Sequence, residues 1–280
     1  MKPSAFDYAK PRTLSDALAL FTHHGDGAKF VAGGQSLIPA MNMRLAAPDV
    51  LIDIGGLAEL GGISMKGGML RIGAGVRQRE IEMSADVARH APLLAKAMPH
   101  VAHAAIRNRG TVGGNLAHAD PASELPACMM ALGARMTIVG SGGARTVAAE
   151  SFFRGIYETD LKPGEILTSI EVPVLAAGRR VWFDELARRR GDYAMVGLAT
   201  VADKFLADAR FVFFAVADRP VLAGATAKAV AGKSGEVAVK AGQEALVHDL
   251  NPAGDLHTSG PAKLHMARVL LGRAIDELTK

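Results

Sequence analysis

The amino-acid sequence predicts an α+β fold of two domains, residues 1–175 and residues 176–280. In the first part, short apolar segments with strand character alternate with segments of helical spacing. In the second part, three strand-like segments over 181–190, 193–205 and 209–223 are followed by helices and loops from about residue 226. A group of strands ahead of a group of helices is typical of α+β proteins. The chain has 280 residues, of which 49% are hydrophobic, so it can fill two cores.

Capping residues and apolar spacing predict the N-terminal elements. Thr13 precedes a segment whose apolar residues recur at helical spacing, and Asp16 three residues later resembles the second member of a capping box. Pro39 fits a short helix only within its first turn. The expected elements are a helix over 14–21, a strand over 29–34 that enters a tight turn, a helix over 36–45 and a buried strand over 49–55.

Two glycine-centred hairpins and three helices are predicted between residues 57 and 175. The hairpin turns are Lys66-Gly67-Gly68 and Ser141-Gly142-Gly143, each between two short strand-like segments. We expect residues 152–173 to form a closing loop and residues 172–180 to link the two domains. The helices are expected over 77–84, 92–99 and 122–134.

The composition excludes several classes of function. The formal net charge is +4, and the densest basic cluster, Arg188 to Arg190, lacks interleaved aromatic residues, so we expect no nucleic-acid partner. The single cysteine, Cys128, cannot form an internal disulfide or hold an iron–sulfur cluster, and its apolar neighbours indicate a buried thiol. No apolar segment is long enough for a membrane span, and the N-terminus lacks a secretory pattern, so we expect a cytoplasmic protein.

Two glycine-rich stretches are the candidate ligand-binding segments. AGGQSL, residues 32–37, follows a predicted strand, and TVGGN, residues 111–115, begins a polar segment that continues to Pro126. Neither has the spacing of a P-loop or of a Rossmann turn. Adjacent glycines nevertheless let backbone N–H groups approach an anion, and Ser36 or Thr111 adds a hydroxyl donor. Taken singly, each stretch is better explained as a plain turn than as a ligand-binding loop.

The longer pattern HAAIRNRGTVGGNLAHADPASELP, with VAGGQSL upstream, resembles the flavin-binding subunit of the molybdenum hydroxylases. FDELARRRGDYAMVG, DRPVLA and DLHTSG resemble later landmarks of that family, so the resemblance covers nearly the whole chain. It implies a PCMH-type FAD-binding domain of two α/β subdomains, about 1–56 and 57–175. It also implies a C-terminal domain over 176–280 with an antiparallel sheet and helices.

The resemblance implies FAD as the cofactor, with its pyrophosphate held between the two glycine-rich loops. Asp120 is expected to accept a hydrogen bond from a ribose hydroxyl, Leu167 to pack on the flavin, and Tyr193 to cover its ring. No catalytic acid, base or nucleophile and no metal ligand is expected on this chain. The residues that the resemblance assigns to FAD are Ala32, Gly33, Gly34, Gln35, Ser36, Leu37, Ile106, Arg107, Thr111, Val112, Gly113, Gly114, Asn115, Asp120, Leu167 and Tyr193.

Some residues near these loops keep two interpretations. His118 is either a neighbour of the ligand or an ordinary polar loop residue. Glu124 is either a second polar contact or a favourable charge at a helix N-terminus. Tyr193 is alternatively a core aromatic at the start of a strand. The contacts of Phe183 and Arg188, on the same edge of the C-terminal domain, are left open.

The function that the resemblance implies is electron transfer. The organic substrate is expected to react at a molybdopterin cofactor on a large partner subunit, and 2Fe–2S clusters on a small subunit would pass the electrons to FAD here. An external acceptor would then receive them. We expect a heterotrimer that forms a dimer of heterotrimers, with the basic region Arg179–Arg190 as a candidate partner surface. A stand-alone flavin-dependent oxidase or dehydrogenase of the same fold, and a scaffold subunit without flavin, are the alternatives.

Overall fold

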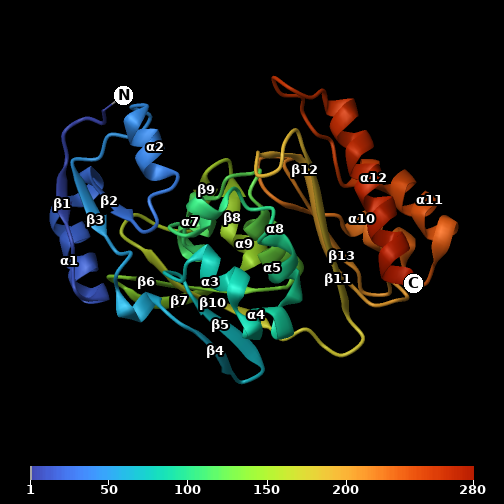
Figure 1. Ribbon diagram of the computed structural model, residues 1–280, viewed down its shortest axis with the longest axis horizontal. Coiled ribbons are helices and arrows are strands. Elements are labelled where there is room, and N and C mark those ends of the chain that lie inside the picture. Colours follow the sequence, from blue (N-terminus) through green and yellow to red (C-terminus); the bar gives the residue numbers. More distant parts are fainter. Residues whose placement is uncertain (1) are drawn as a thin grey trace.

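The computed structural model describes residues 2–280 and has the predicted α+β architecture. Three main sheets follow one another along the longest axis of the molecule, in the order of the chain (Figure 1). The N-terminal sheet is parallel, whereas the central and C-terminal sheets are antiparallel. The candidate site lies where the N-terminal and central parts meet.

The N-terminal sheet ends directly at the first glycine-rich loop. It pairs β1 (Asp7–Ala9) and β2 (Ala28–Val31) with the middle strand β3 (Val50–Asp53). The helix α1 (Leu14–His24) begins as predicted, because the Thr13 hydroxyl accepts a hydrogen bond from the Asp16 N–H at 3.1 Å. The loop then leads from β2 into the short helix α2 (Leu37–Asn42), which has Pro39 in its first turn.

The prediction that residues 152–173 form a closing loop is wrong, because part of this segment belongs to the central sheet. Its last part forms the middle strand of the sheet, and β8 (Phe153–Gly155) pairs with β9 (Glu158–Thr159) in its first part. The middle strand is buried almost throughout, so it shows no alternation of polar and apolar residues. In order across the sheet, the strands are β4 (Ile63–Lys66), β5 (Met69–Gly73), β10 (Ile166–Pro173), β6 (Arg135–Gly140) and β7 (Gly143–Ala148).

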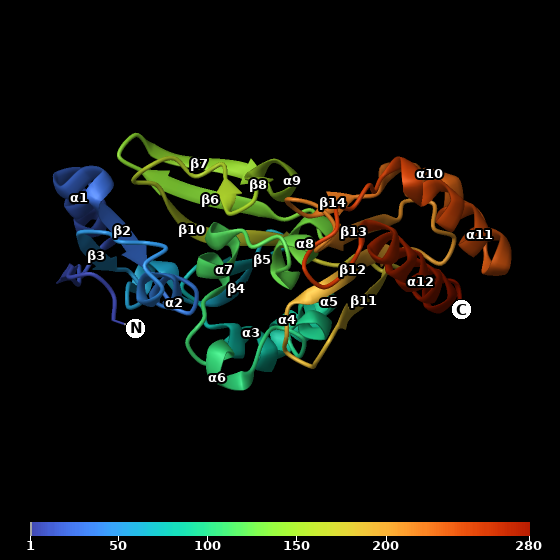
Figure 2. The ribbon, with the colours of Figure 1, turned by 90° about the horizontal axis from the view of Figure 1, so that it is seen from above.

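Short helices accompany the central sheet. In Figure 2, α3, α4 and α6 lie on the opposite side of the molecule from the β6–β7 hairpin. The helix α7 was not predicted, and the second glycine pair lies inside its first turn. Cys128 on α8 is fully buried, as predicted, and burial raises the pKa of its thiol. The helices are α3 (Gln78–Met83), α4 (Ala85–His90), α5 (Pro92–Ala97), α6 (Ala104–Arg107), α7 (Val112–His118), α8 (Glu124–Ala131) and α9 (Ala149–Phe152).

The C-terminal sheet is buried on both faces. Along one strand, Phe211 and Phe213 pack into the core formed with the C-terminal helices, whereas Val212 and Phe214 belong to the core of the central part. This alternation is the two-residue period of a strand with a packed layer on each side. The strands, in order, are β11 (Arg180–Ala187), β12 (Ala194–Ala202), β13 (Arg210–Phe214) and β14 (Val221–Leu222). The division of the chain at residue 175 stays a proposal, since the central core continues beyond it.

Three helices complete the C-terminal part: α10 (Gly224–Val230), α11 (Gly235–Ala245) and α12 (Gly260–Thr279). α12 lies across β11 and β12, while α8 of the central part packs on the other face, against β12 and β13 (Figure 1). The Ser259 hydroxyl accepts a hydrogen bond from the Ala262 N–H and so caps the N-terminus of α12. Among residues 2–280, no helix is both long enough and apolar enough to cross a membrane.

Candidate functional site

The two glycine-rich stretches lie directly against each other. A Cβ atom at Gly33 would lie 2.5 Å from the carbonyl oxygen of Arg109 and 2.8 Å from the Cα of Gly110. A Cβ atom at Gly114 would lie 3.8 Å from the Cβ of Ala32. Only glycine permits the first of these approaches, because both neighbouring atoms are backbone atoms. The fold therefore brings together two segments that are distant in the sequence.

The first loop has unpaired backbone donors. Across residues 2–280, no protein acceptor receives the N–H groups of residues 33–36. Gly34 has a φ of +70°, in the left-handed region that favours glycine. The Gln35 side chain donates to the Gly33 carbonyl at 3.0 Å, and the Ser36 hydroxyl makes no capping bond to α2. Successive free N–H groups with a free hydroxyl can surround an anionic ligand.

The second loop differs from the first, because the N–H groups of residues 112–115 already donate to acceptors within the protein. Thr111 is the N-cap of α7, and its hydroxyl accepts from the Gly114 N–H at 3.1 Å. The N–H of Val112 donates to Val76, that of Gly113 to Ala74 at 2.8 Å, and that of Asn115 to Thr111. A Cβ atom at Gly113 would lie 2.8 Å from the Ala74 carbonyl oxygen. This glycine therefore serves the packing of α7 on the end of β5, and only Gly114 is exposed.

Arg107 forms an ion pair with Glu82, a residue that the sequence analysis did not select. The Arg107 side chain is only 8% exposed, and its Nε and Nη2 donate to the two carboxylate oxygens of Glu82, each at 3.0 Å. Its Nη1 also donates to the Val101 carbonyl at 2.9 Å. The hydrogen bond from Arg107 lowers the pKa of Glu82. The guanidinium therefore holds α3 and α6 together, and the neighbouring Ile106, 36% exposed, is the accessible residue of the pair.

The polar segment after α7 gathers an acidic group and two rings. Asp120 accepts from the Ala122 N–H at 2.9 Å and from the Tyr157 hydroxyl at 3.5 Å. The Tyr157 ring lies 4.8 Å from the His118 ring between centroids. Burial lowers the pKa of His118, which favours its neutral form. His118 therefore contacts Tyr157, a residue on the β8–β9 turn that the sequence analysis did not select.

Tyr193 is not a core aromatic, since its side chain is 71% exposed. Partial burial raises the pKa of Tyr193, and the charges of Asp120 and Glu124 raise it further. Phe183, by contrast, is a core residue that stacks on Phe214 at 5.8 Å between ring centroids. Arg188 lies 3.4 Å from the His257 ring nitrogen.

Glu124 is buried rather than a solvated charge at the start of α8. Its side chain is 8% exposed, and burial raises its pKa to about 8, with a further contribution from the charge of Glu185. Glu185 is also buried, and its Oε2 has no hydrogen-bond partner in the described chain, while its Oε1 lies 3.6 Å from His100. The charges of Glu185 and Asp120 therefore both raise the pKa of the buried Glu124 carboxyl.

Two further predicted residues take different positions. Leu167 is buried in the central core, where β10 shifts its register between residues 167 and 169. The Asn115 side-chain oxygen accepts from the Ser123 hydroxyl at 2.9 Å, which links α7 to the segment that precedes α8. The contact of each with a flavin stays a prediction.

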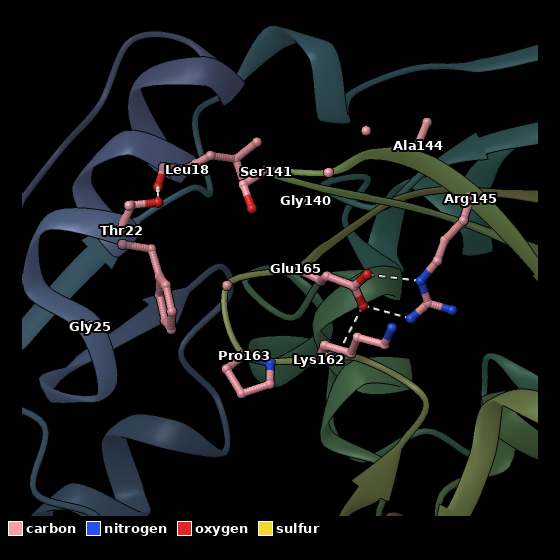
Figure 3. A pocket seen from close by; sticks show the side chains of 14 residues that line it. Leu18, Thr22, Gly25, Gly140, Ser141, Ala144, Arg145, Lys162, Pro163 and Glu165 are labelled. Carbon is pink, nitrogen blue, oxygen red and sulfur yellow. Dashed lines mark hydrogen bonds and ion pairs between the residues drawn. The ribbon is translucent and has the colours of Figure 1, made fainter.

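A cleft of about 480 Å³ lies elsewhere, between α1, the β6–β7 turn and residues 162–165 (Figure 3). None of the residues assigned to FAD lines this cleft. Figure 3 shows the Arg145 guanidinium facing Glu165, with its Nε 2.8 Å from Oε1 of Glu165. Arg145 also pairs with Asp160 at 2.5 Å, so its charge is already balanced within the protein. The glycine-rich loops, not this cleft, remain the candidate site.

Two family models match the chain. The model described as the FAD binding domain in molybdopterin dehydrogenase matches residues 4–175. The model described as the CO dehydrogenase flavoprotein C-terminal domain matches residues 182–278. Together they cover nearly all of the chain.

Similar proteins carry related names. The carbon monoxide dehydrogenase medium chain of Afipia carboxidovorans is 36% identical over 280 residues, covering 99% of this chain and 97% of the relative. The nicotine 6-hydroxylase medium subunit of Paenarthrobacter nicotinovorans is 37% identical over 282 residues, covering 99% and 98%.

Solved structures agree with these relatives. A chain of carbon monoxide dehydrogenase from Hydrogenophaga pseudoflava has a TM-score of 0.94 at 37% identity, covering 98% of this chain and 97% of that one. A chain of quinoline 2-oxidoreductase from Pseudomonas putida 86 has a TM-score of 0.93 at 38% identity, with the same coverage.

We predict that Gly113 and Gly114 differ in how much each contributes to the stability of the fold. Gly113→Ala should lower the free energy of unfolding by about 1–3 kcal/mol, because its Cβ meets the backbone of Ala74. Gly114→Ala should cost about 1 kcal/mol or less, because the only atom closer than 3.0 Å to its Cβ is the Thr111 hydroxyl, which can move. Urea unfolding of both variants checks this, and equal losses would contradict it.

We predict that Glu124→Gln stabilises the protein increasingly as the pH rises from 5 to 8. The folded carboxyl keeps its proton up to a pKa of about 8, whereas the unfolded one ionises near 4.5, so wild-type stability falls between these values. Glutamine does not titrate, so the midpoint of thermal unfolding should move in its favour by about 3 °C for each kcal/mol. Glu244→Gln, at an exposed carboxylate, is the control. A pH-independent difference for Glu124→Gln would refute the proposed burial effect.

Proposed function

The chain belongs to the FAD-binding medium subunits of the molybdenum hydroxylases, and we propose that it holds FAD as an electron-transfer group. In this proposal, the electrons come from a partner chain and leave to an external acceptor. The single observation that supports it best is the row of unpaired N–H groups at residues 33–36, inside the part of the chain that matches an FAD-binding domain. These partly exposed groups are free to donate to a ligand, and a pyrophosphate offers several acceptor oxygens.

The residues present fit FAD from one end to the other. The free N–H groups and the Ser36 hydroxyl suit the pyrophosphate, with the exposed backbone at Gly114 on the opposite side. Asp120 suits a ribose hydroxyl, and the exposed side chains of Ile106 and Tyr193 suit the apolar faces of the rings. The proposed contacts are residues 32–37, Ile106, residues 111–115, Asp120, Leu167 and Tyr193, with Arg107 as a residue that supports Ile106.

Each part of this chain has a defined task in the proposal. The first loop neutralises the two phosphate charges with backbone dipoles rather than with side-chain cations. Asp120 orients the sugar, and Tyr193 limits the access of water and acceptor to the ring. When bound, FAD supplies the exchange between one-electron and two-electron transfer. No side chain of this chain needs to act as a base or a nucleophile.

We further propose that the other redox groups belong to partner chains. The one cysteine of the sequence, Cys128, is fully buried, so this chain cannot ligate 2Fe–2S clusters. The relatives are named as medium chains or medium subunits, which supports a small iron–sulfur subunit and a large molybdopterin subunit as partners. A dimer of such heterotrimers is the proposed assembly.

We predict that the chain binds FAD more tightly than FMN or riboflavin, by about tenfold or more, because only FAD has the full pyrophosphate. Gly34→Ala should weaken FAD binding, because alanine is strained at a φ of +70° and would shift the backbone of the first loop. Riboflavin binding should stay unchanged, because riboflavin has no phosphate for this loop to bind. Gly142→Ala, in the β6–β7 turn where its Cβ meets nothing, is the matched control. Isothermal titration measures the three affinities. Equal affinity for FAD and riboflavin would exclude the pyrophosphate assignment.

We predict that the purified chain binds FAD non-covalently and oxidises no organic substrate by itself. Its flavin should be reduced by substrate only when the chain is co-purified with molybdopterin and iron–sulfur chains, because the electrons must come through them. Stopped-flow absorbance at the flavin band distinguishes the two preparations. Reduction of the isolated chain by an organic substrate would instead favour a stand-alone flavoenzyme.

A further inference from the structure

Residues in unfavourable backbone conformations gather around Asp120. Of the six non-glycine residues with positive φ in the described chain, Ala119, Tyr157 and Ala215 adjoin the segment that carries Asp120. The Tyr157 N–H donates to the Ala119 carbonyl at 3.3 Å, and the Ala215 N–H donates to the Pro121 carbonyl at 2.9 Å. Such conformations persist only where surrounding contacts hold them.

Ala215 is held on its other side by the C-terminal helix. Its φ is +60°, and its carbonyl accepts a hydrogen bond from the Nζ of Lys263 at 2.9 Å. Lys263 lies on α12 and is 9% exposed, and its Nζ also pairs with Asp255 at 2.8 Å. A continuous chain of contacts therefore runs from Asp255 through Lys263 and Ala215 to Pro121, the neighbour of Asp120.

The loop before α12 reaches a second part of the site. Asp255 accepts from the N–H groups of His257 and Thr258 at 2.7 and 2.9 Å, which fixes this loop. The Thr258 hydroxyl lies 3.3 Å from the sulfur of Met195, two residues after Tyr193. The same ion pair therefore supports the start of β12 as well as the segment at Asp120.

We propose that Lys263 and Asp255 are positioning residues of the cofactor site. They hold Asp120 in place through Ala215 and Pro121, and they hold Tyr193 in place through Thr258 and Met195. The inference rests on the proposed function, and it assigns the C-terminal helix a task beyond covering the sheet. The hydrogen bond from Lys263, with the two loop amides, lowers the pKa of Asp255 to about 2, so this carboxyl stays ionised at every working pH.

The test compares Lys263→Met with wild type in the full chain. Methionine fills the buried space but cannot donate to the Ala215 carbonyl or to Asp255. We expect FAD affinity to fall by about tenfold or more, and the absorption spectrum and fluorescence of the bound flavin to change as Tyr193 shifts. The matched control is Arg145→Met, which removes a paired cation beside the remote cleft and should lower the unfolding midpoint while the FAD affinity and spectrum stay as in wild type.

Two milder variants keep the inference testable if Lys263→Met does not fold. Thr258→Val removes only the hydroxyl that faces Met195 and should change the flavin spectrum, whereas Asp255→Asn should lower FAD affinity. Folded variants with wild-type affinity and spectrum would overturn the inference while the proposed function stands. A folded wild-type chain that binds no FAD would overturn the proposed function itself.

Discussion

The contact between Gly33 and the backbone of residues 109–111 is the constraint on which the candidate site depends. No side chain fits between the two segments, so the N-terminal sheet and the central helices meet at one fixed separation. The same contact directs the first loop outward from β2 with its N–H groups unpaired. Because unpaired backbone donors are costly when water is excluded, the loop is suited to a ligand that brings its own acceptors.

The second side of the site, around α6 and α7, is held in place by buried polar groups. The bidentate pair of Arg107 and Glu82 joins two short helices that would be marginal by themselves. Glu124 and Glu185 place two carboxyl groups in the interior, and the fully buried Oε2 of Glu185 has no hydrogen-bond partner in the described chain. Removing Arg107 or Glu82 would leave the other charge buried without its partner, which is costly. This pair therefore fixes the position of α6 relative to α3.

The sequence predicted those structural features that are determined by residues close together in the chain. The Thr13 cap, the hairpin turns and the burial of Cys128 follow from residues within a few positions of each other. β10 could not be recognised, because its partners β5 and β6 are distant in the sequence and its burial on both faces removes the alternating pattern. The partner of Arg107 and the neighbour of His118, Tyr157, are likewise set by tertiary packing. Tertiary packing also uses two amides of TVGGN, since Val76 and Ala74 accept the N–H groups of Val112 and Gly113.

The two-sided burial of the C-terminal sheet has a consequence for how the chain forms during synthesis. Until β12 and β13 leave the ribosome, the side of α8 that packs on these strands stays uncovered, although every residue of the glycine-rich loops has already been made. An independent domain could complete its core as soon as its own residues were made, but the N-terminal 175 residues cannot, because part of their core comes from β12 and β13. The core of the central part is complete only after Phe214, the last residue of β13, has been made.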